Sequence, residues 1–87
     1  MNLKIFTNAS TKCKMITADY HGWTVEEALT NVDRIVDRVR MEGKQIEAKF
    51  ITGHGQIQRE ILSSLKHYGL EPTIQLSNSG VVLVVIE

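Results

Sequence analysis

The sequence has little of what marks secreted or membrane-spanning proteins. Among its 87 residues there is one cysteine, Cys13, so no disulfide can form within the chain and a reducing compartment is expected. No apolar run approaches the roughly 20 residues that a transmembrane helix needs, and the first seven residues contain no signal-peptide core. We therefore predict a cytoplasmic protein without a membrane partner.

An excess of charge of either sign is also absent. Ten Lys and Arg residues balance ten Asp and Glu residues, so the total charge favours no class of partner. The distribution is less even, because Lys4, Lys12 and Lys14 all precede the first acidic residue, Asp19. Phosphate affinity depends on such cations, so any nucleic-acid binding by this chain should be weak and sensitive to salt.

What is present is the composition of one small soluble domain. Apolar residues make up 43% of the chain and charged residues 23%, which is ordinary for a globular protein and argues against disorder. The length leaves no room for a second domain, and there is no repeat or low-complexity tract. We divide the chain into an extension, residues 1–14, and a domain, residues 15–87. Within the extension, residues 3–6 either form a short strand or pack against the core.

Two amphipathic helices are predicted from the spacing of apolar residues. The first begins after Thr24, which forms a capping-box pattern with Glu27, and ends near Gly43. The second runs from about residue 57 to residue 68, where a glycine follows it. Both helices have one apolar face, which predicts that each packs against a sheet.

Four strands fill the segments around these helices, giving the order β-α-β-α-β-β. They are residues 15–20, 48–52, 73–76 and 81–86. This order predicts an α+β two-layer sandwich within the α/β class, with a mixed four-stranded sheet. The first two strands run parallel, whereas the last strand is antiparallel and interior. Residues 81–86 are apolar at every position, which is typical of burial on both faces, and residues 73–76 look like an edge strand.

Histidine and glycine follow both of the predicted parallel strands. Asp19, His21 and Gly22 come at the end of the first strand, and residues 52–55, Thr-Gly-His-Gly, come at the end of the second. In open α/β sheets, ligands bind beyond the carboxyl ends of parallel strands, where helix amino termini also point. We therefore expect these two loops to converge on one edge and to form the functional site.

Asp19 and His21 carry the more specific chemistry. Two residues apart on a strand, they would face the same side, and a carboxylate beside an imidazole can orient it for acid–base work. The same pair could hold a divalent cation. Alternatively, Asp19 only satisfies backbone N–H groups and His21 only packs beneath its loop. Spacing alone does not decide between these interpretations.

The second loop and the neighbouring tryptophan also have two interpretations each. Gly53, His54 and Gly55 could bring backbone N–H groups close to a phosphate. The favoured interpretation is a tight strand-to-helix turn that needs glycine dihedral angles, since the P-loop and dinucleotide-binding patterns are absent. Trp23 could stack on a base or pack against the first turn of the helix.

Three segments together resemble the Smr (small MutS-related) domain family. Residues 18–29 read ADYHGWTVEEAL and are similar to that family's L-D-x-H-G segment followed by T-x-x-E-A-L. Residues 51–55, ITGHG, resemble its second motif, H-G-x-G or T-G-x-G, and residues 78–82, NSGVV, resemble its closing glycine and terminal strand. The departures are Ala18 in place of leucine, Thr52 in place of histidine, and His54 where a lysine or arginine is common.

The resemblance implies a fold, an activity and a set of site residues. The fold is a two-layer sandwich like the carboxyl-terminal domain of a bacterial translation initiation factor. The activity is nicking of DNA or RNA, directed by structure rather than by base sequence, with Mg²⁺ or Mn²⁺ as the candidate metals. We assign catalysis to Asp19, His21 and His54. Candidate nucleic-acid contacts, of which the last three rest on charge and no motif, are Gly22, Thr52, Gly53, Gly55, Arg59, Lys12 and Lys14.

Two other functions stay open at this point. The same edge could serve a DNA- or RNA-binding module that does not cleave, because a fold does not determine a function. The neutral total charge also suits a protein-interaction adaptor. Strong salt dependence of nucleic-acid binding would separate the first two functions from the third.

Overall fold

A computed structural model of the protein describes the backbone of residues 2–7 and 14–87 and the side chains of residues 15–87. Its elements are, in order, β1 (Asn2–Thr7), β2 (Lys14–Asp19), α1 (Val25–Met41), β3 (Ile46–Ile51), α2 (Gln56–His67), β4 (Thr73–Ile74) and β5 (Val81–Ile86). The predicted order from residue 15 onward is confirmed. The question left open for residues 3–6 is also answered, since they lie within a strand.

The described strands form one mixed sheet with the order β1-β2-β3-β5-β4. β2 and β3 are parallel, and the other neighbouring pairs are antiparallel. The four predicted strands are therefore arranged as expected, with β5 inside the sheet between β3 and β4. The sheet gains a fifth strand, because β1 pairs along the whole length of β2 at the opposite edge.

Two strand boundaries differ from the prediction by two residues, and the other differences are of one residue. β3 begins two residues early, at Ile46, because that residue is buried and pairs with Ile86. β4 stops at Ile74, since the N–H of Gln75 already donates to the carbonyl of Val81 and begins a turn. Leu76, expected in the strand, is fully exposed in that turn.

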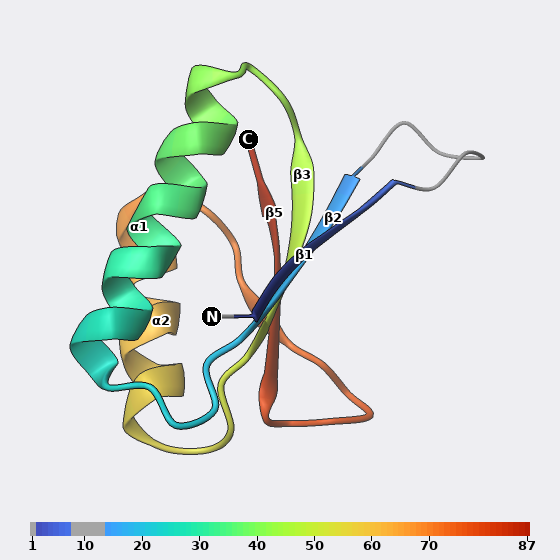
Figure 1. The fold of residues 1–87 in the computed structure, drawn as a ribbon. Helices are drawn as coiled ribbons and strands as arrows, with labels where there is room; N and C mark the ends of the chain where they lie inside the picture. The colour runs from blue at the N-terminus through green and yellow to red at the C-terminus, as the bar shows by residue number, and fades with distance from the viewer. Residues whose placement is uncertain (1, 8–13) are drawn as a thin grey trace.

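Both helices pack on the same face of the sheet, so the molecule has two layers (Figure 1). The core lies between the layers, and the predicted apolar faces of α1 and α2 point into it. Tyr20, which directly follows β2, and Phe50, in β3, are the largest fully buried side chains of this core, and their rings stack with centroids 5.8 Å apart. This arrangement confirms the predicted two-layer α+β sandwich.

The prediction that the last strand is buried on both faces was wrong. In β5, Val82, Val84 and Ile86 are buried beneath the helices, but Val85 is 42% exposed and Leu83 is half-buried. The reason is that α1 and α2 cover one face only, and no described element lies over the other face (Figure 1). The apolar sequence of β5 therefore exceeds what the single chain buries.

Candidate functional site

Three segments meet at the end of the sheet where the parallel strands finish. The first loop, residues 20–24, joins β2 to α1, and the second loop, residues 52–55, joins β3 to α2. They start side by side, because the N–H of Tyr20 donates to the carbonyl of Ile51 at 3.0 Å. The β4–β5 turn, residues 75–80, reaches the same end (Figure 1). The predicted convergence of the two loops is confirmed.

The β4–β5 turn is joined to the second loop by backbone hydrogen bonds. The N–H groups of Thr52 and Gly53 both donate to the carbonyl of Gly80, at 2.9 and 3.0 Å. The two backbone segments approach so closely that a Cβ on Gly80 would lie 3.2 Å from the Cα of Gly53. The turn is therefore a third part of the candidate site, and the sequence did not predict its presence there.

The premise that Asp19 and His21 lie on one strand was wrong. β2 ends at Asp19, and His21 lies in the turn that follows. The Asp19 carboxylate accepts a hydrogen bond from the backbone N–H of His21 at 2.9 Å, which is the structural alternative considered above. The His21 imidazole is exposed, and no hydrogen bond joins it to another described residue. Asp19 thus shapes the first loop, and His21 faces solvent.

His54 has a definite partner in the β4–β5 turn. Its Nε2 lies 2.6 Å from the Oγ of Ser79, and the Nε2 amide group of Gln58 donates to the backbone carbonyl of Ser79, also at 2.6 Å. Ser79 therefore connects the second loop to the first turn of α2. The sequence did not predict this contact, because nothing in the spacing of two residues 25 positions apart relates them.

The glycines of the second loop are required by the backbone. Gly53 has φ +69° and Gly55 has φ +123°, and a side chain is strained at both. The favoured interpretation of this loop, a tight turn that depends on glycine dihedral angles, is confirmed. The same turn gives α2 an N-cap that makes no side-chain hydrogen bond, which is compatible with a phosphate contact.

The two helices that leave this edge begin in different ways. At α1, the Thr24 Oγ1 accepts from the N–H of Glu27 at 3.1 Å, and the Glu27 Oε1 accepts from the N–H of Thr24 at 2.9 Å. These hydrogen bonds, first the one from the backbone of Thr24, hold the pKa of the Glu27 carboxyl below its usual value. The predicted capping box is confirmed, and its negative charge lies at the positive end of the helix.

α2 has neither of these features. Its N-cap is Gly55, which has no side chain to accept a hydrogen bond, and its first turn contains no acidic residue. The first N–H groups of a helix have no partner within the helix, and the helix dipole gives them partial positive charge. Within the described residues no side chain caps them, so the edge has one helix start that is suited to an anion.

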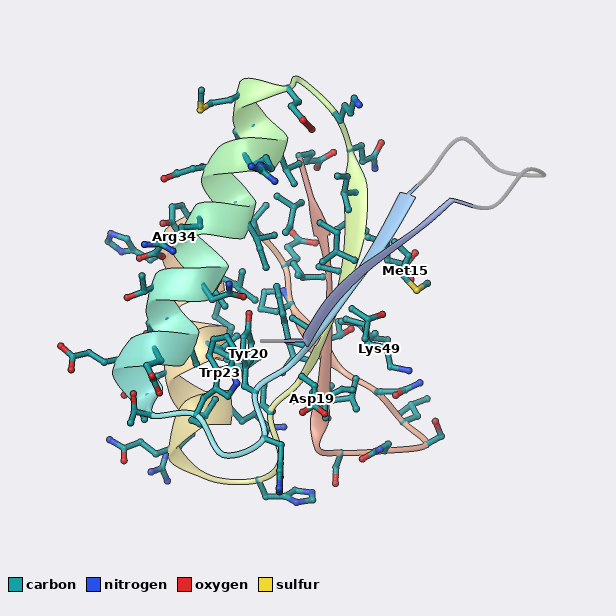
Figure 2. All side chains as sticks on the ribbon, in the orientation of Figure 1. Met15, Asp19, Tyr20, Trp23, Arg34 and Lys49 are labelled. Atoms are coloured by element: carbon teal, nitrogen blue, oxygen red, sulfur yellow. The ribbon has the colours of Figure 1, made fainter. Side chains whose placement is uncertain are left out.

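Trp23 is held by packing. Its ring meets Tyr20 edge-on with centroids 5.0 Å apart, and it packs against the core (Figure 2). Tyr20 is itself fixed, since its OH donates to Asn31 at 2.9 Å, and burial raises the pKa of its phenol. Of the two interpretations of Trp23, the structure supports packing, and the pair anchors the first loop to the core.

The candidate cationic contacts are scattered. Arg59 is exposed near the start of α2, where its N–H donates to the carbonyl of Gly55. Lys14, however, begins β2 at the end opposite to Asp19, about 17 Å away along the strand. The structure therefore does not bring Lys14 to the site, and Lys12 lies outside the described residues.

The described residues contain no group of three or more His, Cys, Asp or Glu side chains that could hold a metal ion. Asp19 and His21 offer one carboxylate and one imidazole, and one oxygen of that carboxylate already accepts the N–H of His21. Mg²⁺ commonly uses one or two carboxylates together with substrate phosphates. Any such ion would therefore need ligands from the nucleic acid and from water.

Comparison with known proteins found no relative of this chain. No protein family, no curated protein and no solved structure matches the chain significantly. Neither helix within the described residues has the length and apolar character to cross a membrane. The functional interpretation consequently depends on the three-part edge made by the two loops and the β4–β5 turn.

Proposed function

We propose that this edge binds the phosphate backbone of DNA or RNA and nicks it, as the resemblance to the Smr family implies. The observation that carries the proposal is the pairing of an uncapped helix start, at α2, with two histidines on adjacent loops. The N–H groups that follow Gly55 would receive the phosphate. His21 and His54 would supply the proton transfers that breaking a phosphodiester requires.

The roles follow from what each side chain already contacts. The His21 imidazole is exposed and makes no hydrogen bond to a described residue, so it could accept a proton from the attacking water or sugar hydroxyl. His54 would return a proton to the leaving oxygen, with its ring held by Ser79. Asp19 would act through the first loop, whose turn it stabilises by accepting the N–H of His21. The attacking oxygen would form one P–O bond as His21 takes its proton, and the P–O bond to the leaving oxygen would break as His54 protonates that oxygen.

The experiment is a nicking assay on supercoiled plasmid and on a structured RNA. The protein, His21→Ala and His54→Ala are compared with Mg²⁺, with Mn²⁺ and with a chelator. His67→Ala is the matched control, because this third histidine lies at the far end of α2. We expect cleavage to fall about 100-fold or more in the first two variants and to be unchanged in the control. Cleavage that survives in both folded site variants would contradict the assigned roles.

A second candidate function is a binding module that does not cleave. It is favoured by one observation, the use of the Asp19 carboxylate to accept a backbone N–H, which leaves the neighbouring imidazole without an orienting partner. This function predicts salt-dependent binding of nucleic acid with no product in any assay arm. A partner that binds independently of salt would instead favour the protein adaptor.

A further inference from the structure

The face of the sheet turned away from the helices is more apolar than an exposed face needs to be. Strands that read as continuous apolar runs are normally covered on both faces, and β5 is such a strand. Yet Val85 is 42% exposed and Met15 37% exposed. Figure 2 shows Met15 and Lys49 on this side, opposite Tyr20 and Trp23. We call this surface the open face.

Strand register places the residues of the open face in cross-strand rows. Met15, Glu47 and Val85 are paired across β2, β3 and β5, and form one row. Two positions further along the strands, Thr17, Lys49 and Leu83 are paired in the same way and form a second row. The centre of the open face thus carries one acidic and one basic residue, two positions apart on β3, with apolar side chains beside them.

We propose that the open face is the contact surface of a symmetric dimer of this chain. In this dimer the open faces of two copies pack against each other. The two-fold axis lies between the two sheets, crosses β3 at right angles and passes Ala48. The β3 strands of the two copies therefore run in opposite directions. Glu47 of one copy then faces Lys49 of the other, and the same contact repeats by symmetry. The same operation brings Val85 opposite Leu83 of the second copy. An axis parallel to β3 would oppose like charges, so the charges select the antiparallel arrangement.

Charge and partnering favour a second copy over other occupants. Among the described residues, the side chains of Glu47 and Lys49 make no hydrogen bond or ion pair, so both are available to a partner. With Asp19 also on this side, the described charges of the open face do not favour a polyanion such as nucleic acid. The face is therefore complementary to itself, and distinct from the phosphate-binding edge.

The size of the open face predicts a weak dimer. Four strands of six residues, β1, β2, β3 and β5, spaced about 4.8 Å apart and rising about 3.3 Å per residue, give a footprint of roughly 380 Å². Stable complexes bury about 800 Å² per partner, so association should require high protein concentration. Packing of two sheets about 10 Å apart also suits side chains of this size.

Sedimentation velocity over a wide range of concentration tests the proposal with two charge reversals. Glu47→Lys makes both residues basic and Lys49→Glu makes both acidic, so each turns two attractive contacts into repulsive ones. We expect each variant alone to raise the dimer dissociation constant about tenfold or more. The double variant Glu47→Lys, Lys49→Glu, and an equimolar mixture of the two single variants, should both restore association.

Matched controls are Asp37→Lys and Arg34→Glu, which make the same changes of charge on exposed positions of α1. Figure 2 shows Arg34 on the helix side of the molecule, away from the open face. They should leave the dissociation constant unchanged, and circular dichroism should show every variant folded. The proposal is overturned if the protein stays monomeric at its highest soluble concentration. It is also overturned if the reversals have no effect, if the controls weaken association equally, or if the double variant fails to restore it. None of these outcomes depends on nuclease activity.

Discussion

Two helices begin at the same edge of this sheet, but only one of them has its first backbone N–H groups capped by side chains. α1 starts with a complete capping box between Thr24 and Glu27, whereas α2 starts at Gly55 with no side-chain cap. The loop before α1 is further tied down by Asp19, which accepts the N–H of His21. In the first loop most backbone N–H groups are paired within the protein, so the loop stabilises the fold. At the start of α2 the backbone N–H groups have no side-chain acceptor, so they can bind a ligand.

Charge reinforces the contrast. The first turn of α1 holds two acidic residues, Glu26 and Glu27, which would repel a phosphate from that helix start. The first turn of α2 holds none, and Arg59 follows shortly after it. Although the loops are adjacent, an anion should therefore prefer the second. Substitutions in the anchored first loop and in the open second loop should therefore have different effects.

The largest effect should come from removing the anchor of the first loop. Tyr20→Ala deletes a buried aromatic side chain that packs against Phe50 and Trp23. We expect the free energy of unfolding to fall by about 3 to 5 kcal/mol, as for other large aromatic side chains in cores. Urea unfolding followed by circular dichroism measures the loss.

Because that variant could fail to fold, a milder one accompanies it. Tyr20→Phe keeps the ring and removes only the hydrogen bond to Asn31, so the loss should be about 1 kcal/mol. Met41→Ala, at an 87% exposed position, serves as the control and should change stability by less than about 0.5 kcal/mol. Equal losses in all three variants would show that the first loop has no such anchor.

The second loop should be sensitive through its backbone. Gly55 has φ +123°, and no atom lies near the position of an added Cβ, so Gly55→Ala meets backbone strain without a steric clash. We expect a loss of about 1 to 3 kcal/mol in urea unfolding. We also expect weaker binding of nucleic acid, because the loop must rearrange. An unstrained, fully stable alanine variant would remove the argument that this turn requires glycine.

Removing the cap of α1 should affect stability alone. Thr24→Ala deletes the hydroxyl that accepts the N–H of Glu27 and should cost about 1 kcal/mol. Nucleic-acid affinity should be unchanged, because the proposed contact lies at α2. Fluorescence anisotropy with a labelled oligonucleotide checks this, and a clear loss of affinity would mean that the two helix starts are not divided in this way.

The smallest effect concerns pH. The pKa of Glu27 is lowered below its ordinary value of 4.5 by its hydrogen bonds to Thr24, so its charged form stabilises the folded state. That contribution is present above pH 4.5 and is lost as the pH falls through the lower pKa of the folded protein. The small stability difference between the protein and Glu27→Gln should therefore shrink in acid. Thermal melts from neutral pH to about pH 3 measure it.

The parts of this molecule that the sequence could predict depend on short-range patterns. Thr24 and Glu27 lie three residues apart, and the helix cap they form needs no knowledge of the rest of the fold. The convergence of the two loops followed from the β-α-β order alone, since parallel strands end at one edge. The interior position of β5 followed from its apolar composition.

The parts that it could not predict depend on where a strand stops or which distant segments meet. The expected pairing of Asp19 with His21 was wrong because β2 ends at Asp19 and His21 lies in the turn that follows, so the two residues do not share a strand. The contact between His54 and Ser79 joins the β3–α2 loop to the β4–β5 turn. No spacing rule in the sequence relates these two residues. Likewise, Val85 is exposed because both helices pack on the opposite face of the sheet.

The most direct test of the central claim, that an anion binds at the open start of α2, is an NMR titration. The ¹⁵N-labelled protein is titrated with a short structured RNA and with a DNA hairpin, and the backbone amide shifts are followed. The largest changes are predicted for the amides of residues 54–58, with smaller ones in the first loop and little change at α1 from Val25 onward. Shifts centred on the first turn of α1 or on the open face, or no shifts at low salt, would contradict the account.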